Sequence, residues 1–303
     1  MDALLYKFFS ALSQGCAFLF FTVGIAVAFR WIKFPDLTGD GSFTLGGVVT
    51  ARLVSEGWSV WLAMPIAVIA GFAAGCGTYA MHRYLRVPKI LAGVLMMMGL
   101  YTINLRILGR PNLQFPREAG ILGFLPSASG KEWAFHAFLL FSAFAFIALL
   151  ILYAFLESRL GLVMRVCGAN PRMASMHGIA PTKLFLGLGM ANALIAFSGA
   201  LIAQRSYNAD ILMGAGQVVV AVAALFIGMV LFRRASSAQI LAAATVGSLI
   251  YMILMQAALE VGVQAQDFRL ISTLIVLGAI FVASLRGRGE ALRKGADAFG
   301  IDG

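Results

Sequence analysis

Apolar residues gather in eight long stretches along the chain, separated by charged or helix-breaking segments. A helix that crosses a bilayer needs about 20 mostly apolar residues. The stretches are 8–29, 57–81, 90–105, 133–156, 184–204, 211–232, 235–259 and 270–285. The two shortest, 90–105 and 270–285, can lengthen because Arg106 and Arg286 can extend their charged ends to the interface. The pattern predicts an all-α fold, a polytopic transmembrane helical bundle with about 8–10 spans in a single domain, 1–303.

A ninth apolar stretch, Phe43–Ser55, is too short to assign with the same rule and contains Arg52. It either crosses the bilayer or folds back within it. The side of the membrane on which the N-terminus lies depends on this choice, so the stretch leaves both that side and the span count open.

The composition excludes several classes of protein. Hydrophobic residues make up 61% of the chain and charged residues only 12%, with a mean hydropathy of +0.90. Soluble domains are about 25% charged. A soluble enzyme, a disordered protein and a disulfide scaffold are therefore excluded. The three cysteines form no CxxC pair and are interpreted as packing residues. The first apolar stretch is long and lacks a small-residue cleavage site, so we expect a membrane helix there and no cleavable signal peptide.

The net charge of +10, from 23 Lys and Arg against 13 Asp and Glu, is best explained by membrane orientation. Thirteen of the cations lie in four regions: His82–Lys89, Glu157–Lys183, Arg233–Arg234 and the tail from Arg286. Loops rich in Lys and Arg stay in the cytoplasm. The four regions alternate correctly along the chain to share that side, which predicts a cytoplasmic C-terminus. Segments 106–132 and 260–269 are then outside. The excess of basic residues therefore does not indicate a nucleic-acid partner.

A weak internal similarity appears when the sequence is displaced by 174 residues. Gly15 then falls on Gly189, and Asp36-Leu37 falls on Asp210-Ile211. The match is either chance or the trace of two inverted halves, 1–156 and 184–285, joined by a cytoplasmic loop, 157–183, and followed by a cytoplasmic tail, 286–303. Transporters commonly have this plan, with the binding site at the interface of the halves. An inverted repeat would place the N-terminus outside.

The first polar element within the apolar framework runs from Phe34 to Phe43. Its Pro35, Gly39 and Gly41 are helix-breaking residues. Asp36, Thr38, Asp40 and Ser42 are of the types that cap helices, here a helix starting near Phe43. One interpretation is a half-helix start that lines a translocation pathway. The other is an ordinary surface loop, and the spacing favours neither.

Other polar residues have two interpretations as well. Asp210 and Gln217 lie in the segment that matches the first element, and both are candidates to face a pathway. Asp210 is alternatively the cap of an interfacial helix, which is slightly favoured. Asn104 and three further residues place polar groups inside apolar helices, as interhelical hydrogen bonds or as pore lining. These three are Tyr101, Asn192 and Gln256. Gly71-x-x-x-Gly75 permits close helix approach, more simply inside the subunit than at a dimer seam.

The third polar element, in the largest basic loop, predicts a short capped helix. Asn170 is a good N-cap, Pro171 suits the first helical position, and Gly178 suits the position after the helix. A helix of two turns is not stable alone in water. It either lies on the protein at the interface or docks into a partner, and Met173 and Met176 suit adaptable apolar contacts.

The sequence contains no catalytic constellation. GxxxxGK[ST], GxSxG, HExxH and CxxC are all absent, so we expect no catalytic residues, cofactor or metal in this chain. If transport uses ATP, another subunit must bind it. An ion-coupled secondary transporter is the alternative, and that class usually carries ionisable residues inside the membrane. The only candidates here are Asp36, Asp40 and Asp210, all at helix starts.

Three stretches resemble the integral-membrane permease subunits of bacterial ABC importers. They are FPDLTGDGSFTLG at 34–46, LAGVLMMMGLYTINLRILGRPN at 91–112, and 161–178 with its Gly-x-Asn-Pro core. The chain resembles the branched-chain amino acid and ribose permease superfamily, and within it the group of aromatic amino acid-type and uncharacterised permeases. Gly39 stands where that group usually has Val, and Gln204–Tyr207 also departs from it, which puts substrate contacts in doubt.

The resemblance implies a set of partners and roles. Two permease subunits, as a homodimer in the bacterial inner membrane, would form the pathway, two ATPase subunits would bind ATP and Mg²⁺, and a periplasmic binding protein would meet 109–132. The substrate would be an amino acid or a similar small solute. The ATPase-coupling helix would comprise Gly168, Asn170, Pro171, Arg172, Met173, Met176, His177 and Gly178, and Asp36, Thr38, Asp40, Ser42, Asn104, Asp210 and Gln217 would be candidates for the pathway.

Overall fold

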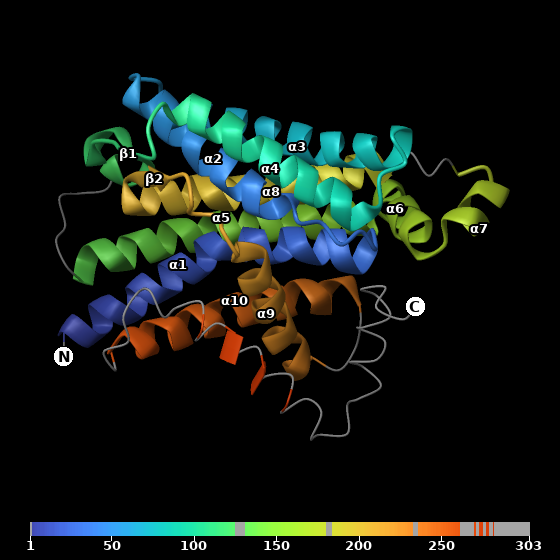
Figure 1. Cartoon of the computed structure of the whole chain (residues 1–303). Helices are drawn as coiled ribbons and strands as arrows, with labels where there is room; N and C mark the ends of the chain where they lie inside the picture. The colour runs from blue at the N-terminus through green and yellow to red at the C-terminus, as the bar shows by residue number, and fades with distance from the viewer. Residues whose placement is uncertain are drawn as a thin grey trace.

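The computed structural model is a bundle of helices, and it describes residues 2–124, 131–179, 184–232 and 236–260, with isolated residues between 270 and 281 (Figure 1). Several predictions from the sequence fall on other parts of the chain. The segment 261–269, Arg233–Arg234, most of the stretch 270–285 and the tail 286–303 lie outside the described residues.

The helices are α1 (Asp2–Ala26, continued by a π-helical turn Val27–Trp31), α2 (Thr38–Ser55), α3 (Val60–Tyr84), α4 (Lys89–Leu108), α5 (Lys131–Glu157), α6 (Arg159–Ala169), α7 (Pro171–Met176), α8 (Leu184–Ser206), α9 (Gln217–Leu231) and α10 (Ser237–Glu260). Two short strands, β1 (Asn112–Gln114) and β2 (Asn208–Asp210), pair antiparallel, and 3-10 turns follow at Arg117–Ala119 and Ile121–Phe124. Among the described residues, six helices are long and apolar enough to cross a membrane: α1, α3, α4, α5, α8 and α10.

Two of the predicted boundaries are wrong. The stretch 211–232 is not a single helix: residues 211–216 form turns, and α9 begins at Gln217 and has 15 residues. At 1.5 Å per residue α9 is about 22 Å long, less than the roughly 30 Å of a hydrocarbon core. The short stretch Phe43–Ser55 belongs to an 18-residue helix, α2, which starts five residues earlier than the pattern predicted.

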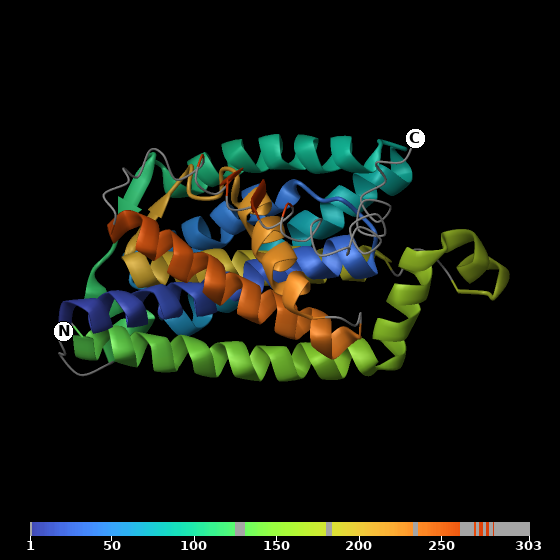
Figure 2. The same ribbon diagram turned by 90° about the horizontal axis from the view of Figure 1, so that it is seen from below.

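The centre of the bundle is formed by α1, α2 and α8. α1 packs against α5, α8 and α10, and α8 packs against α1, α2 and α3. Figure 2 shows α4 and α5 along opposite edges of the molecule, and their outward side chains are exposed leucines, isoleucines and phenylalanines. Such an apolar exterior suits lipid, because lipid tails are as apolar as these side chains. The predicted polytopic helical bundle is confirmed.

The two parts of the chain that the displacement of 174 residues aligns share local structure. Lys33 and Tyr207, at corresponding positions, both have left-handed backbones, with φ of 54° and 53°. Three residues further on, the Asp36 carboxylate accepts a hydrogen bond from the backbone N–H of Thr38, as the Asp210 carboxylate does from Leu212. The displacement places α1 on α8 and α3 on α10. The packing partners are exchanged between these pairs, because α1 packs on α10 and α8 packs on α3. These matches show local similarity between the two parts, and the inverted arrangement of the halves stays a prediction.

The contacts also show which segments lie at each end of the bundle. Lys7 at the start of α1 pairs with Glu260 at the end of α10, and Arg205 at the end of α8 donates to Ser10. The sheet of β1 and β2 lies at that end (Figure 1). α6, α7 and the basic segment 82–89 lie at the opposite end. Of the four cation-rich segments, the two that the structure describes, 82–89 and 157–179, therefore lie at the same end, while the places of the other two and the side that each end faces stay predictions.

Close backbone contact holds α2 to α8. A Cβ added to Gly46 would lie 1.8 Å from the carbonyl oxygen of Ala196, and one added to Gly199 would lie 1.9 Å from that of Phe43. Each helix thus presents a glycine to the other helix's backbone, as small residues do where membrane helices approach closely. The Gly71 and Gly75 pair packs on α8 in the same way, so the interpretation as packing inside the subunit is confirmed.

We predict that Gly199→Ala lowers the thermal midpoint of the detergent-solubilised protein, because the added methyl group must push α2 away from α8. The matched control is Gly99→Ala on α4, where nothing lies within 4 Å of the added atom. Alanine there should raise stability by up to about 1 kcal/mol, since glycine is the poorer helix former. Thermal unfolding followed by tryptophan fluorescence measures both, and equal midpoints for the two variants would contradict the close-contact role.

Candidate functional site

A buried polar network surrounds the first turn of α2. The Asp36 side chain, 1% exposed, accepts hydrogen bonds from the Thr38 N–H at 2.9 Å and from the Asn192 amide at 2.7 Å. Ser42 donates to the same Asn192 side chain at 2.6 Å. The segment 34–43 is therefore not an ordinary surface loop, and its polar groups join α2 to α8. Non-helical backbone can lie inside such a bundle only where protein satisfies its polar groups, as here.

The prediction that Gly39 and Gly41 break the helix is wrong. Both lie within α2, because the Asp36 carboxylate caps the backbone at Thr38 and starts the helix there. Glycine is a poor helix former, but a larger residue at either position would press on a neighbouring helix. A Cβ on Gly39 would lie 3.0 Å from Val218, and one on Gly41 would lie 2.9 Å from Leu100. Tight packing against α9 and α4 thus overrides local propensity.

Two further contacts extend the network to α3 and α4. The hydroxyl groups of Thr38 and Thr78 are 2.8 Å apart, and the Asn104 amide donates to the Gly41 carbonyl at 3.2 Å. For Asn192 the structure thus shows interhelical hydrogen bonds, the simpler of its two alternatives, and Thr38 makes an interhelical contact as well. Asn104 is also fully buried, but it lies at the edge of a cavity described below.

Asp40 binds the start of α9. Its carboxylate accepts from the backbone N–H groups of Gly216 at 2.8 Å and Val218 at 2.7 Å, and the Thr44 hydroxyl accepts from Gly214 at 3.1 Å. Asp40 and Thr44 are called the α2 clamp below. Helix N-termini have unsatisfied N–H groups and a partial positive charge, which a carboxylate stabilises. The clamp supplies this cap from another helix, since Gly216, at the cap position, has no side chain.

Two cavities flank the turn that precedes α9, and both are lined by Leu212, Ala215 and Gly216. The first, about 610 Å³, lies between this turn, α2 and α4, and Asp40 and Asn104 line it. The second, about 570 Å³, lies between the turn, α1 and α10.

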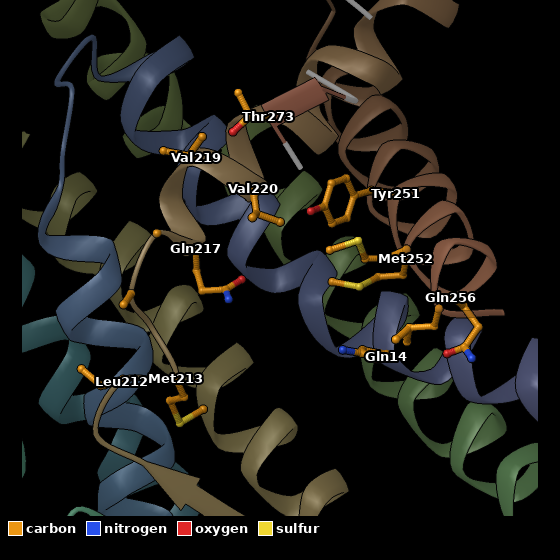
Figure 3. A pocket seen from close by; sticks show the side chains of 14 residues that line it. Gln14, Leu212, Met213, Gln217, Val219, Val220, Tyr251, Met252, Gln256 and Thr273 are labelled. Atoms are coloured by element: carbon orange, nitrogen blue, oxygen red, sulfur yellow. The ribbon is translucent and has the colours of Figure 1, made fainter. Parts of the chain in front are cut away.

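Figure 3 shows the second cavity, with side chains from α1, α9 and α10 around it. Gln217 lines it. Tyr101 lines the first cavity and Gln256 the second, and the hydrogen bond of Gln256 goes to Glu260 on its own helix. A place in the pathway stays a prediction for all three.

The remaining candidates for the pathway take structural positions. Asp36, Thr38 and Ser42 line neither cavity and are buried in the network. Asp210 lines neither cavity either; it caps the turn at Leu212 and receives a 3.4 Å hydrogen bond from Asn112 across the two-stranded sheet. The slightly favoured interpretation of Asp210 as a cap is thus the one the contacts support.

Sequence reasoning missed two residues of this region. Gln14 lines the second cavity and Thr44 belongs to the α2 clamp. Gln14 had a detectable signal, because it is a polar side chain inside the apolar stretch 8–29. Thr44 had none, since a threonine inside a helix normally bonds to its own helix.

The short helix α7 has the predicted local structure. Asn170 accepts the backbone N–H of Met173 at 3.0 Å, Pro171 occupies the first turn, and Gly178 has a φ of 71°. Met173 is 54% exposed and Met176 86% exposed, and Figure 1 shows α7 beyond the end of the main bundle.

The helix before it is fixed to the bundle. A Cβ on Gly168 in α6 would lie 2.1 Å from the Trp31 carbonyl oxygen, so Gly168 is a packing residue that anchors α6 on the π-helical turn. Arg165 donates to Ser237 and to the Leu156 carbonyl, both at 2.7 Å. Arg172 and His177 are exposed on or beside α7.

Comparison with known proteins identifies the family. Residues 8–285 match the family model described as the permease component of branched-chain amino acid transport systems. The chain belongs to this permease family. The match covers the helices that form the network, the clamp, both cavities and α7, so the protein is a multi-pass membrane protein of the transport permease class.

Three curated relatives of this permease are informative. It is 31% identical, over 91% of each chain, to a protein named tyrosine transport system permease protein from Clostridioides difficile. It is 32% identical to an uncharacterized protein of Rickettsia prowazekii, over 91% of this chain and 95% of the relative. It is 24% identical to a fructose import permease protein of Bifidobacterium longum, over 76% of this chain and 64% of the relative. No solved structure matches.

For this permease we predict that Asp40→Ala frees the start of α9. Backbone amides at Gly216 and Val218 lose their acceptor, so hydrogen exchange at 212–218, measured by mass spectrometry, should increase about tenfold or more. Losing a helix cap also costs about 0.5–2 kcal/mol of stability.

The control is Asp210→Ala, which removes a single exposed cap from Leu212 and should leave exchange at Val218 unchanged. If Asp40→Ala exchanges at the wild-type rate at Gly216 and Val218, the α2 clamp does not hold α9.

Proposed function

We propose that this protein is the permease subunit of an ATP-binding-cassette importer that forms the pathway for a small solute across the bacterial inner membrane. The family match over residues 8–285 is the observation that carries the proposal. Alternating access is then a shift in population between inward-facing and outward-facing states, driven by ATP hydrolysis in a partner.

α7 is proposed as the coupling helix. Its two exposed methionines give an adaptable apolar surface of the kind used in protein contacts. The contacts of Gly168 and Arg165 tie α6 to the ends of α1, α5 and α10. A force on α7 would therefore reach three membrane helices through α6. The main departure from the expected set is Gly168, which supports the helix from within and does not belong to its exposed face.

The proposed partners follow from this class of transporter. ATPase subunits would bind α7 and carry the ATP and Mg²⁺, a second copy of the permease would complete the pathway, and a periplasmic binding protein would meet the 109–132 segment. The described part of that segment includes β1, the two 3-10 turns and the first two residues of α5. In this orientation α7 and the C-terminus are cytoplasmic, which the positive-inside rule favours.

An amino acid is the proposed substrate. The relative named for tyrosine transport matches over 91% of both chains, whereas the relative named for fructose import is less similar and covers 76% of this chain. The closer similarity favours amino acids, and an aromatic one first.

The ion-coupled alternative is less well supported. Coupling carboxylates in secondary transporters must be free to bind and release ions. Here Asp36 is bound by Thr38 and Asn192, and Asp40 by two backbone amides at the start of α9. Both carboxylates are thus accounted for by structural hydrogen bonds.

We predict that the double variant Met173→Asp, Met176→Asp abolishes co-purification of the ATPase subunit while the permease still inserts into the membrane. Two charges on an apolar docking surface must be desolvated without partners, which is costly. Co-purification from membranes that contain both subunits is the measurement.

The control is Gln114→Asp, which adds a charge to exposed β1 at the opposite end of the molecule. It should leave ATPase binding intact. ATPase binding at the wild-type level by the methionine double variant would remove the coupling-helix assignment, and failure of the wild-type permease to bind any ATPase subunit would reject the importer proposal itself.

A further inference from the structure

The second cavity has a lining suited to a polar but uncharged ligand. Three glutamines from three different elements line it: Gln14 from α1, Gln217 from the first turn of α9, and Gln256 from α10. Figure 3 shows these three around the cavity, with Met252 in the region between them. Such a convergence of amides is unusual in a chain with so few polar side chains inside its helices.

The amides are available for a ligand. Gln14 and Gln217 are half-buried, and within the described residues neither side chain makes a hydrogen bond. Gln256 has one weak contact, 3.5 Å to Glu260. Each glutamine carries two donors and an acceptor oxygen, so the set can bind hydroxyl groups as well as the ammonium and carboxylate of a zwitterion.

The charge of the described lining restricts the class of ligand. None of the described residues that line this cavity is Lys, Arg, His, Asp or Glu. Among these residues a ligand with a net charge would find no compensating charge for its lost hydration, which is costly. An uncharged ligand can instead hydrogen-bond to the glutamine amides. A zwitterionic ligand can do the same while its two opposite charges partly compensate each other.

The rest of the described lining is mostly apolar and adaptable. Met213, Met252 and Met255 line the cavity with Leu259 and Val220, and Tyr251 lines it as well. Thioether sulfur atoms make favourable contacts with aromatic rings and adjust to irregular shapes. A volume of about 570 Å³ is within the usual range of roughly 300–1,000 Å³ for sites that bind small molecules.

We propose that this cavity is a binding site for a neutral or zwitterionic solute with an aromatic or aliphatic body, held at its polar end by Gln14 and Gln217. The site lies within one subunit and is bounded by the turn that the α2 clamp holds. It rests on the proposed function, because a solute that enters it is taken to be cargo of the permease.

The test uses the full-length permease in lipid nanodiscs, with radiolabelled L-tyrosine as the probe and no ATPase present. Wild type should bind saturably. The double variant Gln14→Leu, Gln217→Leu keeps the side-chain volume and should weaken binding at least about tenfold, since a polar ligand end is left without partners. The control, Gln114→Leu, makes the same change on exposed β1 and should bind as wild type.

A second variant tests the cavity without altering the glutamines. Val219 lines it and is 56% exposed, so Val219→Trp fills the space with little effect on folding and should abolish binding. Excess tyramine, a cation, and 3-(4-hydroxyphenyl)propionate, an anion, should displace tyrosine poorly. D-fructose, which lacks an apolar body, should not displace it.

Three outcomes overturn the proposal: no saturable binding of tyrosine by wild type, binding by the glutamine double variant that equals wild type, or displacement by tyramine, the propionate or fructose as effective as by unlabelled tyrosine. Co-purification of the ATPase subunit, measured separately, reports on the importer function. A permease that binds its ATPase but shows any of the three outcomes would retain that function and lose this site.

Discussion

The hydrogen bonds from the α2 clamp to the start of α9 are the interaction on which the arrangement of the centre depends. α9 is too short to span a bilayer and begins inside the molecule, where its free N–H groups would be costly without acceptors. Asp40 and Thr44 supply those acceptors from α2. The turn before α9 is thereby fixed in place, and it forms the wall between the two cavities.

The position of α2 depends in turn on its contacts with α8. Gly46 and Gly199 let the two backbones approach closely. The side chains of Asp36 and Ser42 also form hydrogen bonds with Asn192 on α8. Close packing and polar bonding therefore act at the same place. A shift of α8 would be felt by α2, and through the clamp by the start of α9. The proposed coupling helix reaches the same centre from the other side, through α6 and the end of α1.

Local and tertiary effects conflict most clearly at the start of α2. Helix propensity predicted that Gly39 and Gly41 would delay the helix to Phe43, and the prediction was wrong because these glycines face Val218 and Leu100 at close range. The opposite error occurred at 211–232, where an apolar composition suggested one continuous span. The turn at 211–216 keeps its shape because Asp210 caps Leu212 and α2 binds the following amides.

The sequence by itself determined the membrane class, six of the spanning helices and the capped helix α7. These follow from hydrophobic length, charge distribution and capping chemistry, all of which act over a few neighbouring residues. It also indicated the polar positions in the apolar helices, but not their roles. Only the tertiary structure decided that Asp36, Thr38 and Ser42 join helices, that Asp40 caps α9 and that Gln14, Gln217 and Gln256 meet at one cavity. The reason is physical: a buried polar group takes its role from partners far away in the chain, and their distance and direction exist only once the helices have packed.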